Sequence, residues 1–302
     1  MRIIVTGATG FVGRNLLPKI IHANHEIFEI TINPDLSKEL YGDNTEQFYF
    51  FNDNVNKLKN ELDNFKPEVL IHLASYLTSS DDTEDMQKLI NSNIFFLCQV
   101  LDAVKDSGLK WFINTGSFAE YYKGDGVFDP AYLYSATKTA SRIFVDYYSK
   151  AYKFNYTTIV PYTIYGGVDT QEKIIDLIFN SLDSEKSVSL TQGNQVLDFI
   201  HIEDVTDFYI TCLLNLHKIP NGTSFQLGTG IGHTLREISA IMEMSTNKFS
   251  NIAWGSKSYR PRDVMFAVAN ISNQDLLFNW KPKITIEDGI KKYLEERKII
   301  IK

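Results

Sequence analysis

The sequence has little cysteine and no long apolar run, and each absence excludes a class of protein. Cys98 and Cys212 are the only cysteines in 302 residues, and each lies in an apolar stretch without a CxxC partner. This favours two buried, reduced thiols over a disulfide or a metal site. No apolar run reaches the ~18 residues that a membrane span requires, and a glycine turn at Gly7 comes too early for a signal peptide. We therefore expect a cytoplasmic protein that does not cross a membrane.

The sequence also lacks clustered basic residues and metal-ligand spacings. Lys and Arg number 30 against 37 Asp and Glu, a formal net charge of −7, which argues against binding to nucleic acid or to an anionic membrane. The six histidines show no spacing typical of metal ligands, so no metal is expected. His201 lies in an alternating, strand-like segment and is expected to be a core or positioning histidine.

Short β-branched and aromatic runs alternate with helical patterns through the first half of the chain. This alternation is typical of βαβ units in a parallel sheet that carries helices on both faces. We predict strands at residues 2–6, 26–32, 47–51, 69–73, 111–115 and 156–160, and long helices at residues 86–104 and 134–152. The sequence therefore predicts an α/β fold with a doubly wound parallel sheet of the Rossmann type.

The second half of the chain looks like a smaller region packed on the first. After Gly166 and Gly167 the pattern loosens into shorter elements, and no linker rich in Pro or Ser separates the halves. We expect the Rossmann domain at residues 1–165 and a smaller α/β region at residues 166–302. The chain is expected to return to the larger domain around residues 196–217.

A glycine-rich turn follows the first predicted strand and opens a helix. Its spacing, GxxGxxG, allows a tight turn, close approach of the backbone to a pyrophosphate at the helix N-terminus, and close packing of the helix on the sheet. We therefore predict a dinucleotide site formed by Gly7, Thr9, Gly10, Phe11, Val12, Gly13 and Arg14. The alternative is a plain turn between a strand and a helix.

The second predicted strand lacks the terminal acidic residue that usually binds the adenosine ribose and repels a 2′-phosphate. It ends in Thr31 and Asn33, and Arg14 could reach a 2′-phosphate, so NADP(H) is favoured over NAD(H). Arg14 could instead be a solvated surface charge. Asp53 is placed to accept a hydrogen bond from the adenine amino group, or else to cap the next helix.

A tyrosine, a lysine and a serine form a candidate catalytic group. Tyr134 and Lys138 lie one turn apart on one face of a predicted helix. A nearby cation lowers the pKa of a phenol, which would make Tyr134 a usable proton donor or acceptor for a carbonyl and alcohol pair. Ser117 follows the fifth predicted strand, at the sheet edge where ligands bind in doubly wound folds, and could polarise the same carbonyl.

Together these motifs resemble the extended short-chain dehydrogenase/reductase family, which acts largely on nucleotide-activated sugars. The resemblance covers essentially the whole chain and includes residues 71–74, Asn93, residues 162–166, residues 198–205 and residues 260–263. It implies that Tyr134 is the acid–base residue and that Ser117 orients the substrate hydroxyl or ketone. It also implies that Lys138 holds the nicotinamide ribose and tunes Tyr134.

The resemblance implies further contacts. Leu73 and Ala74 are expected to line the cofactor site. Arg260 is expected to bind the pyrophosphate of a sugar nucleotide, a role that suits a planar, permanently charged group, and a salt bridge to Asp263 is the alternative. Thr163 is an expected substrate contact, although the family usually has Asn there.

Departures from the family pattern narrow the reaction. Members that eliminate water carry an Asp-Glu pair directly after the residue that matches Ser117, whereas this chain has Phe118 and Ala119, with Glu120 one position later. A dehydratase is therefore disfavoured. Residues 114–118, 265–270 and the tail from Trp280 are most similar to CDP-abequose synthases and related nucleotide 4-ketosugar reductases. This implies NADPH-dependent reduction of a C4 ketone on a nucleotide sugar, with CDP favoured, for surface polysaccharides such as O-antigen.

Two other functions use the same residues or the same fold. A nucleotide-sugar 4-epimerase or 4-dehydrogenase with tightly bound NAD needs the same three side chains and stays open. A dinucleotide-binding protein without catalysis is disfavoured, because a binding module has no need of a tuned phenol. The helices at residues 86–104 and 134–152 could pair across a twofold axis, so we expect a homodimer; alternatively their apolar stripes only cover the sheet.

Overall fold

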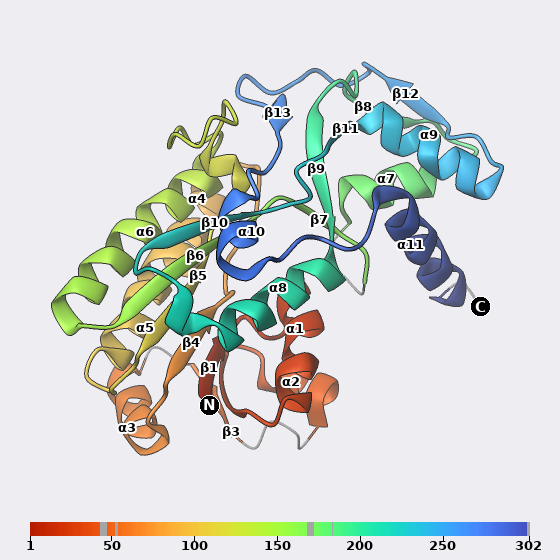
Figure 1. Ribbon diagram of the computed structural model, residues 1–302. Helices are drawn as coiled ribbons and strands as arrows, with labels where there is room; N and C mark the ends of the chain where they lie inside the picture. Colours follow the sequence, from red (N-terminus) through yellow and green to blue (C-terminus); the bar gives the residue numbers. More distant parts are fainter. Residues whose placement is uncertain (43–46, 52–53, 168–171, 183, 301–302) are drawn as a thin grey trace.

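The computed structural model describes residues 1–42, 47–51, 54–167, 172–182 and 184–300. In this part of the chain a seven-stranded parallel sheet, in the order β10-β6-β5-β4-β1-β2-β3, forms the centre of the molecule (Figure 1). Its strands are β1 (Arg2–Thr6), β2 (Glu26–Thr31), β3 (Gln47–Phe50), β4 (Val69–His72), β5 (Trp111–Thr115), β6 (Asn155–Pro161) and β10 (Thr223–Leu227). The predicted Rossmann fold is confirmed.

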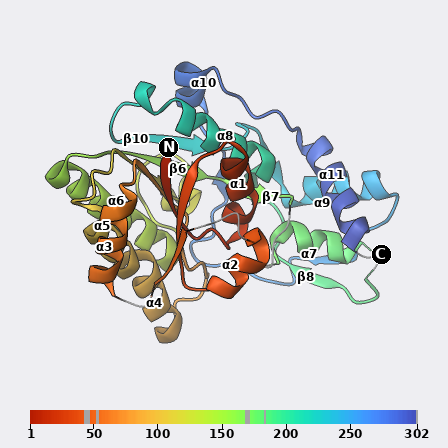
Figure 2. The same ribbon diagram turned by 90° about the horizontal axis from the view of Figure 1, so that it is seen from below.

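Helices cover both faces of this sheet (Figure 2). One face carries α1 (Phe11–His22) and α8 (Ile202–Leu214), and the other carries α3 (Val55–Phe65), α5 (Phe96–Val104) and α6 (Leu133–Tyr152). Ile3, Ile4 and Val5 are at most 1% exposed, because central parallel strands are buried on both faces and therefore consist of continuous apolar runs. The short α2 (Pro34–Tyr41) follows β2.

The six strands predicted in the first half are present, each within one residue of its predicted ends. The strand β10 was not predicted. It lies at the edge of the sheet beside β6, and Phe225 and Leu227 are its only fully buried residues. A short strand that buries alternate residues gives a weak sequence signal.

The helix predicted at residues 86–104 is helical throughout but is not one regular α-helix. It consists of α4 (Thr83–Ile90), a π-helical turn η2 (Asn91–Phe95) and α5. A π-turn inserts an extra residue into the helical repeat and occurs often at functional sites. Here it carries the buried Asn93.

The smaller region has its own two sheets and its own core. In one sheet β9 (Val196–His201) pairs with β7 (Thr163–Tyr165), β11 (Gly232–Thr234) and β13 (Phe266–Ala267), and in the other β8 (Val188–Leu190) pairs with β12 (Ile252–Trp254). Its core lies among α7 (Ile174–Ser181), α9 (Leu235–Thr246) and α11 (Ile286–Ile300).

The chain passes from the smaller region back to the large sheet after β9. The strand β9 belongs to the smaller sheet, whereas α8 packs on α1 and β10 joins β6. The return therefore begins with α8, which lies within the expected residues 196–217, and continues to β10, which lies beyond them. Asp198 of β9 helps to join the two parts, because its buried carboxylate accepts hydrogen bonds from Thr229, Gly230 and Ala269.

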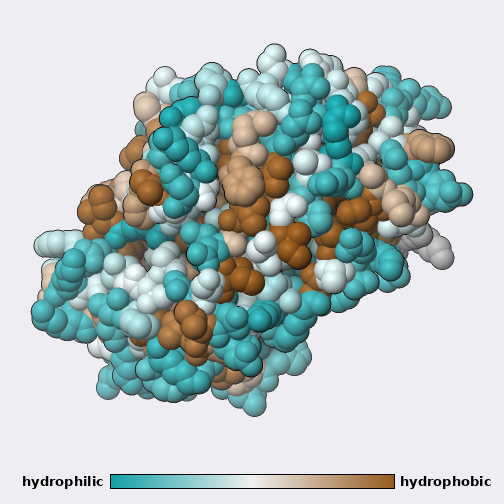
Figure 3. Space-filling model, turned by 45° about the horizontal axis from the view of Figure 1, so that its top comes forward, coloured by the Kyte–Doolittle hydropathy of each residue, from teal (hydrophilic) through white to brown (hydrophobic). Residues whose placement is uncertain are grey.

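The prediction of two buried, reduced cysteines is confirmed in part. Both cysteines are free, Cys212 is buried, and Cys98 is half-buried rather than buried. No helix in the described ranges is long and apolar enough to cross a membrane. On the face seen in Figure 3, apolar residues occur in separate patches framed by hydrophilic residues.

The chain after β13 is held to the large domain by an aromatic cluster. The ring of Phe208, on α8, lies 5.3 Å from Phe225, 4.8 Å from Trp280 and 6.1 Å from Phe278 at the end of α10 (Ser272–Phe278). Aromatic pairs at these separations add to the free energy of burial.

We predict that Phe208→Ala lowers the free energy of unfolding by about 3–5 kcal/mol, because it leaves a cavity among three other rings. Urea unfolding followed by fluorescence and circular dichroism measures the change. Leu276→Ala, at a side chain that is 82% exposed, is the control and should change the stability by less than ~0.5 kcal/mol. Equal effects of the two substitutions would contradict the prediction.

Candidate active site

The glycine turn after β1 lies against the end of β4. Gly7 has φ +72°, and a Cβ there would come within 2.5 Å of the Ala74 amide nitrogen. A Cβ on Gly13 would come within 2.3 Å of the Ala8 carbonyl oxygen. Glycine is therefore required at both positions. The Ala74 amide also donates a 3.3 Å hydrogen bond to the Thr6 hydroxyl, which fastens the β4 end to β1.

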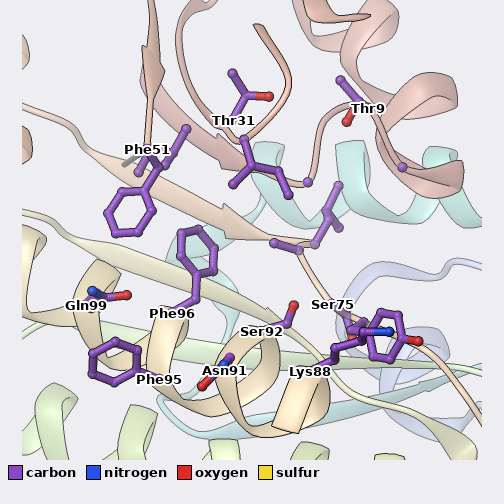
Figure 4. Close-up of a pocket in the computed structure, with 17 residues that line it drawn as sticks. Thr9, Thr31, Phe51, Ser75, Lys88, Asn91, Ser92, Phe95, Phe96 and Gln99 are labelled. Carbon is purple, nitrogen blue, oxygen red and sulfur yellow. The ribbon is translucent and has the colours of Figure 1, made fainter. Parts of the chain in front are cut away.

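A cavity of about 720 Å³ opens beside this turn (Figure 4). The predicted residues Gly7, Thr9, Gly10, Leu73 and Ala74 line one part of it. The remaining lining residues come from the ends of β2 and β3, the loop after β4, and the helical segment from α4 to α5: Ile30, Thr31, Ile32, Phe51, Ser75, Tyr76, Lys88, Asn91, Ser92, Phe95, Phe96 and Gln99.

The two parts of the cavity suit the two chemical parts of a dinucleotide. The rings of Phe51 and Phe96 meet edge to face at 5.0 Å (Figure 4), and an aromatic wall of this kind suits a purine base. Because Gly7 and Gly10 have no side chains, the backbone of the turn lines the cavity directly at the N-terminus of α1, where it suits a pyrophosphate. The residues present therefore fit a dinucleotide cofactor.

Four predicted residues of the turn, Phe11, Val12, Gly13 and Arg14, lie outside this lining. The Nε of Arg14 donates a 2.7 Å hydrogen bond to the Thr9 carbonyl, so its guanidinium is held beside the turn. Phe11 lies under the Lys173 ammonium, 3.1 Å from the ring centroid, and Val12 packs on the core under the sheet. Asp53 lies outside the described residues.

The end of β2 contributes a threonine hydroxyl, and no acidic side chain, to the cavity lining. Thr31 lines the cavity, and its hydroxyl accepts a 3.1 Å hydrogen bond from the Asn33 amide. The nearest acid on β2, Glu29, is fully buried and accepts a hydrogen bond from Ser37. Burial raises the pKa of Glu29. Its carboxyl therefore does not replace the acidic residue usual at this strand end.

The structure brings Ser117 and Tyr134 together. Tyr134 and Lys138 lie in the first two turns of α6, which begins where the Ser135 hydroxyl accepts a 3.0 Å hydrogen bond from the Tyr132 amide. The hydroxyls of Ser75 and Ser117 lie near the phenol of Tyr134, and each lowers its pKa. Ser75, from the loop after β4, was not identified from the sequence.

Burial governs the protonation of this group. It raises the pKa of Tyr134, and the hydroxyls of Ser75 and Ser117 only partly oppose the rise. Burial also lowers the pKa of Lys138 to about 8. We expected Lys138 to bring the pKa of Tyr134 toward neutrality, but desolvation of the phenol outweighs any such effect in this structure.

Asn93 connects the loop after β4 with α6. Its side-chain amide donates 3.0 Å hydrogen bonds to the Tyr76 carbonyl and to the Thr137 hydroxyl, and its oxygen accepts a 2.8 Å bond from the Tyr76 amide. Because Thr137 immediately precedes Lys138, this side chain fixes the loop that carries Ser75 relative to the helix that carries Tyr134.

A buried ion pair lies behind Ser117 and was also missed. Glu120 and Arg142 pair at 2.6 Å, and the Glu120 carboxylate caps the short helix η3 (Phe118–Glu120) through the Ser117 amide. The sequence did carry signals for both residues. Ser117 and Glu120 have the Ser-x-x-Glu spacing of a capping box, and Arg142 lies four residues after Lys138.

A second cavity, of about 560 Å³, lies beside the start of α6. It is lined by Tyr132, Arg260 and Arg262 among others. Arg260 pairs with Asp263 at 3.0 Å, as the alternative reading expected, and its guanidinium lies 5.6 Å from the ring centre of Tyr132. The Tyr132 ring in turn stacks on Tyr134 at 5.9 Å. The structure thus places Arg260 both in an ion pair and beside Tyr132, the ring that stacks on the candidate catalytic tyrosine.

The remaining predicted residues have structural positions. His201 is buried, its Nδ1 accepts a 3.3 Å hydrogen bond from the Glu203 amide at the start of α8, and burial lowers its pKa to about 4. A neutral capping histidine agrees with the expected positioning role. Thr163 begins β7, and its substrate contact stays a prediction. Within the described ranges no group of His, Cys, Asp and Glu could hold a metal ion.

A family model described as the NAD dependent epimerase/dehydratase family matches residues 3–228. The chain belongs to this family. It is therefore an NAD(P)-dependent oxidoreductase of the extended short-chain dehydrogenase/reductase type, a family that uses nicotinamide cofactors.

Individual relatives span most of the chain. A CDP-abequose synthase from Salmonella typhimurium is 28% identical over 97% of this chain and 97% of its own length. One from Yersinia pseudotuberculosis is 28% identical over 88% of this chain and 91% of its own length. A mutant UDP-glucuronic acid 4-epimerase from Bacillus cereus, solved with UDP-4-deoxy-4-fluoro-glucuronic acid and NAD, superposes with a TM-score of 0.89 at 20% identity, over 99% of this chain and all of that one.

Proposed function

We propose that the protein reduces the C4 ketone of a nucleotide-activated 4-keto-deoxy sugar with NADPH. The observation that carries this proposal is the buried group of Ser117, Tyr134 and Lys138 at the edge of the sheet next to a cavity that fits a dinucleotide. Such a group can deliver a proton to a carbonyl oxygen while a hydride reaches the carbonyl carbon.

The three side chains have separate tasks in the proposed reaction. The turn at Gly7 and Gly10 would hold NADPH, whose oxidation to NADP⁺ would supply the hydride for C4. The Tyr134 phenol, kept protonated by its raised pKa, gives its proton to the ketone oxygen, which becomes the C4 hydroxyl. The Ser117 hydroxyl donates a hydrogen bond to the same oxygen. In its ammonium form Lys138 stabilises the phenolate that remains.

The position of Glu120 supports reduction over elimination of water. A dehydratase needs a carboxyl group that is free to protonate a leaving hydroxyl. The Glu120 carboxylate is fully buried, binds Arg142 through both oxygens, and accepts a 2.7 Å hydrogen bond from the Ser117 amide. The Glu120 carboxylate is therefore held in structural contacts and is not free to protonate a leaving hydroxyl. Phe118 and Ala119 have no acidic side chain.

A CDP-linked sugar is the substrate that the relatives favour. Two similar proteins are CDP-abequose synthases. The second cavity is lined by Tyr132, Arg260 and Arg262, and the Tyr132 ring stacks on Tyr134. We assign the sugar nucleotide to this cavity, with its pyrophosphate at Arg260 and the sugar toward Ser117 and Thr163. The product would serve the synthesis of surface polysaccharide.

The second candidate is a nucleotide-sugar 4-epimerase or 4-dehydrogenase with tightly bound NAD. The similarity of fold to the Bacillus cereus 4-epimerase supports it. It requires the same proton-transfer group, so the residues do not separate the two reactions. The end of β2 favours the reductase, because it lacks the acid that usually selects NAD.

Tyr134→Phe tests the proton transfer. We expect the turnover of a CDP-linked 4-keto-deoxy sugar to fall by roughly 10²- to 10⁴-fold, because the phenol is the proton donor, while NADPH affinity stays nearly unchanged. Steady-state kinetics and fluorescence titration measure the two quantities. Tyr152→Phe, at the far end of the same helix, is the control. A turnover near that of the wild type would remove Tyr134 from the mechanism.

Arg14→Gln tests the choice of cofactor. A guanidinium that binds the 2′-phosphate contributes about 1.5–3 kcal/mol, so we expect the Kd for NADPH to rise by roughly 10- to 100-fold with little change for NADH. Calorimetric titration with both cofactors measures the difference, and Lys19→Gln on the same helix is the control. Equal weakening of NADPH and NADH would mean that Arg14 acts only through its bond to the Thr9 carbonyl.

We also propose a homodimer formed through α4, η2 and α6. These elements carry Met86, Ile90, Phe95, Ile143 and Tyr147, which are 42–70% exposed. Light scattering of the wild type should give twice 34.5 kDa, and Ile143→Asp should shift the mass toward one chain because it places a charge in the apolar contact. A single-chain mass for the wild type at high concentration would contradict the proposal.

A further inference from the structure

An ion pair that faces away from solvent lies behind the candidate catalytic group. The Glu120 side chain is 0% exposed and that of Arg142 is 12% exposed. Arg142 binds the carboxylate in a bidentate manner, with Nε to Oε2 at 2.6 Å and Nη2 to Oε1 at 3.1 Å. A buried pair of this geometry costs free energy of desolvation, and its removal one partner at a time leaves an uncompensated charge.

The carboxylate holds the backbone of Ser117. The Ser117 amide donates a 2.7 Å hydrogen bond to Oε1 of Glu120, the oxygen that also binds Nη2 of Arg142. The preceding residue, Gly116, leaves room for the pair, since a Cβ there would come within 2.6 Å of Glu120 and 2.7 Å of Arg142. The position of Ser117 therefore depends directly on Glu120.

The same two charges act on Lys138. Tyr134, Lys138 and Arg142 follow one another at four-residue spacing along one face of α6. Lys138 is 3% exposed, and burial, the main cause, lowers its pKa to about 8. Glu120 raises this pKa and Arg142 lowers it. The two members of the pair thus affect the ammonium in opposite directions.

The other titratable groups around α6 are neutral or paired with one another, so Glu120 and Arg142 are the charges that act on Lys138. His72, on β4, faces Lys138, and burial holds its pKa at about 3, so it is neutral. On the helices packed against α6, Glu84, Asp85 and Lys88 of α4 pair with one another. Asp102 of α5 pairs with Lys105, directly after that helix, and with Lys59 of α3. On the outer part of α6 itself, Asp146 pairs with Lys150 and bonds to Tyr156 of β6.

We propose that the Glu120–Arg142 ion pair is a positioning device that fixes Ser117 and holds its two opposite charges at the face of α6 that carries Lys138. Arg142 is itself fixed, because it donates hydrogen bonds to Tyr121 and to Ser224 of β10, and its guanidinium lies 5.1 Å from the ring centre of Phe128. The edge strand β10 is thereby connected to the catalytic group. The use of this device in catalysis rests on the proposed function, whereas its electrostatic effect does not.

The test is a titration of Lys138 by NMR in protein that carries [¹³Cε]lysine, with the Lys138 signal assigned from its loss in Lys138→Gln. Glu120→Gln should lower the midpoint of the Lys138 titration by about one pH unit, and Arg142→Gln should raise it by a similar amount. Arg142→Lys, which keeps the charge, should titrate like the wild type. Asp102→Asn, in a surface pair of α5, is the control and should cause no shift.

Shifts of both single variants in the same direction, or no shift in either, would overturn the proposal. A thermal melt checks that each variant folds. If the single variants do not fold, the double variant Glu120→Gln with Arg142→Gln keeps the test open, because it leaves no unpaired charge. Its Ser117 amide proton resonance should move upfield as the charged acceptor is lost, and an unmoved resonance would contradict the proposal. Neither measurement uses a sugar substrate, so a failed reductase assay would not be mistaken for a failure here.

Discussion

The close approach of the glycine turn after β1 to the end of β4 is the constraint on which the site depends. A side chain at Gly7 would collide with Ala74, and the Thr6 hydroxyl bonds both the Ala74 amide and His72 Nδ1. The dinucleotide cavity lies beside this contact, and the loop after β4 continues from it. That loop carries Ser75 to the phenol of Tyr134, so the cofactor cavity and the proton-transfer group are positioned by the same backbone.

The helix α6 concentrates the chemistry along one buried face. Tyr134, Lys138 and Arg142 succeed one another at four-residue spacing, and two cations and a phenol at this density would be costly without compensation. Glu120 supplies the compensating negative charge and is held in place as the cap of η3. The arrangement explains why this chain keeps a carboxylate close to Ser117 although the carboxylate takes no part in the proposed proton transfer.

The sequence was sufficient for the fold and for the residue types of the site, since both depend on local patterns. Alternating apolar runs predicted six strands, and GxxGxxG and YxxxK predicted the turn and the face of α6. The interactions that the sequence analysis missed are made across the fold. Ser75 meets Tyr134 only after β4 is placed, and β10 is an edge strand with weak alternation. The pKa of Tyr134 was misjudged because the desolvation of the phenol depends on packing that no spacing reveals. The capping-box spacing of Ser117 and Glu120 is present in the sequence, but the sequence analysis interpreted Glu120 only as an acid one position later than the Asp-Glu pair of dehydratases.

The most direct test of the account follows a labelled hydride. The protein is incubated with NADPH that carries deuterium at C4 of the nicotinamide and with CDP-, GDP-, dTDP- and UDP-linked 4-keto-deoxy sugars, and products are examined by mass spectrometry while NADP⁺ is measured. The account predicts one deuterium per product molecule, one equivalent of NADP⁺, and the fastest reaction with the CDP-linked sugar. Recovery of tightly bound NAD from the denatured protein, together with interconversion of sugars without NADPH consumption, would contradict it and identify an epimerase.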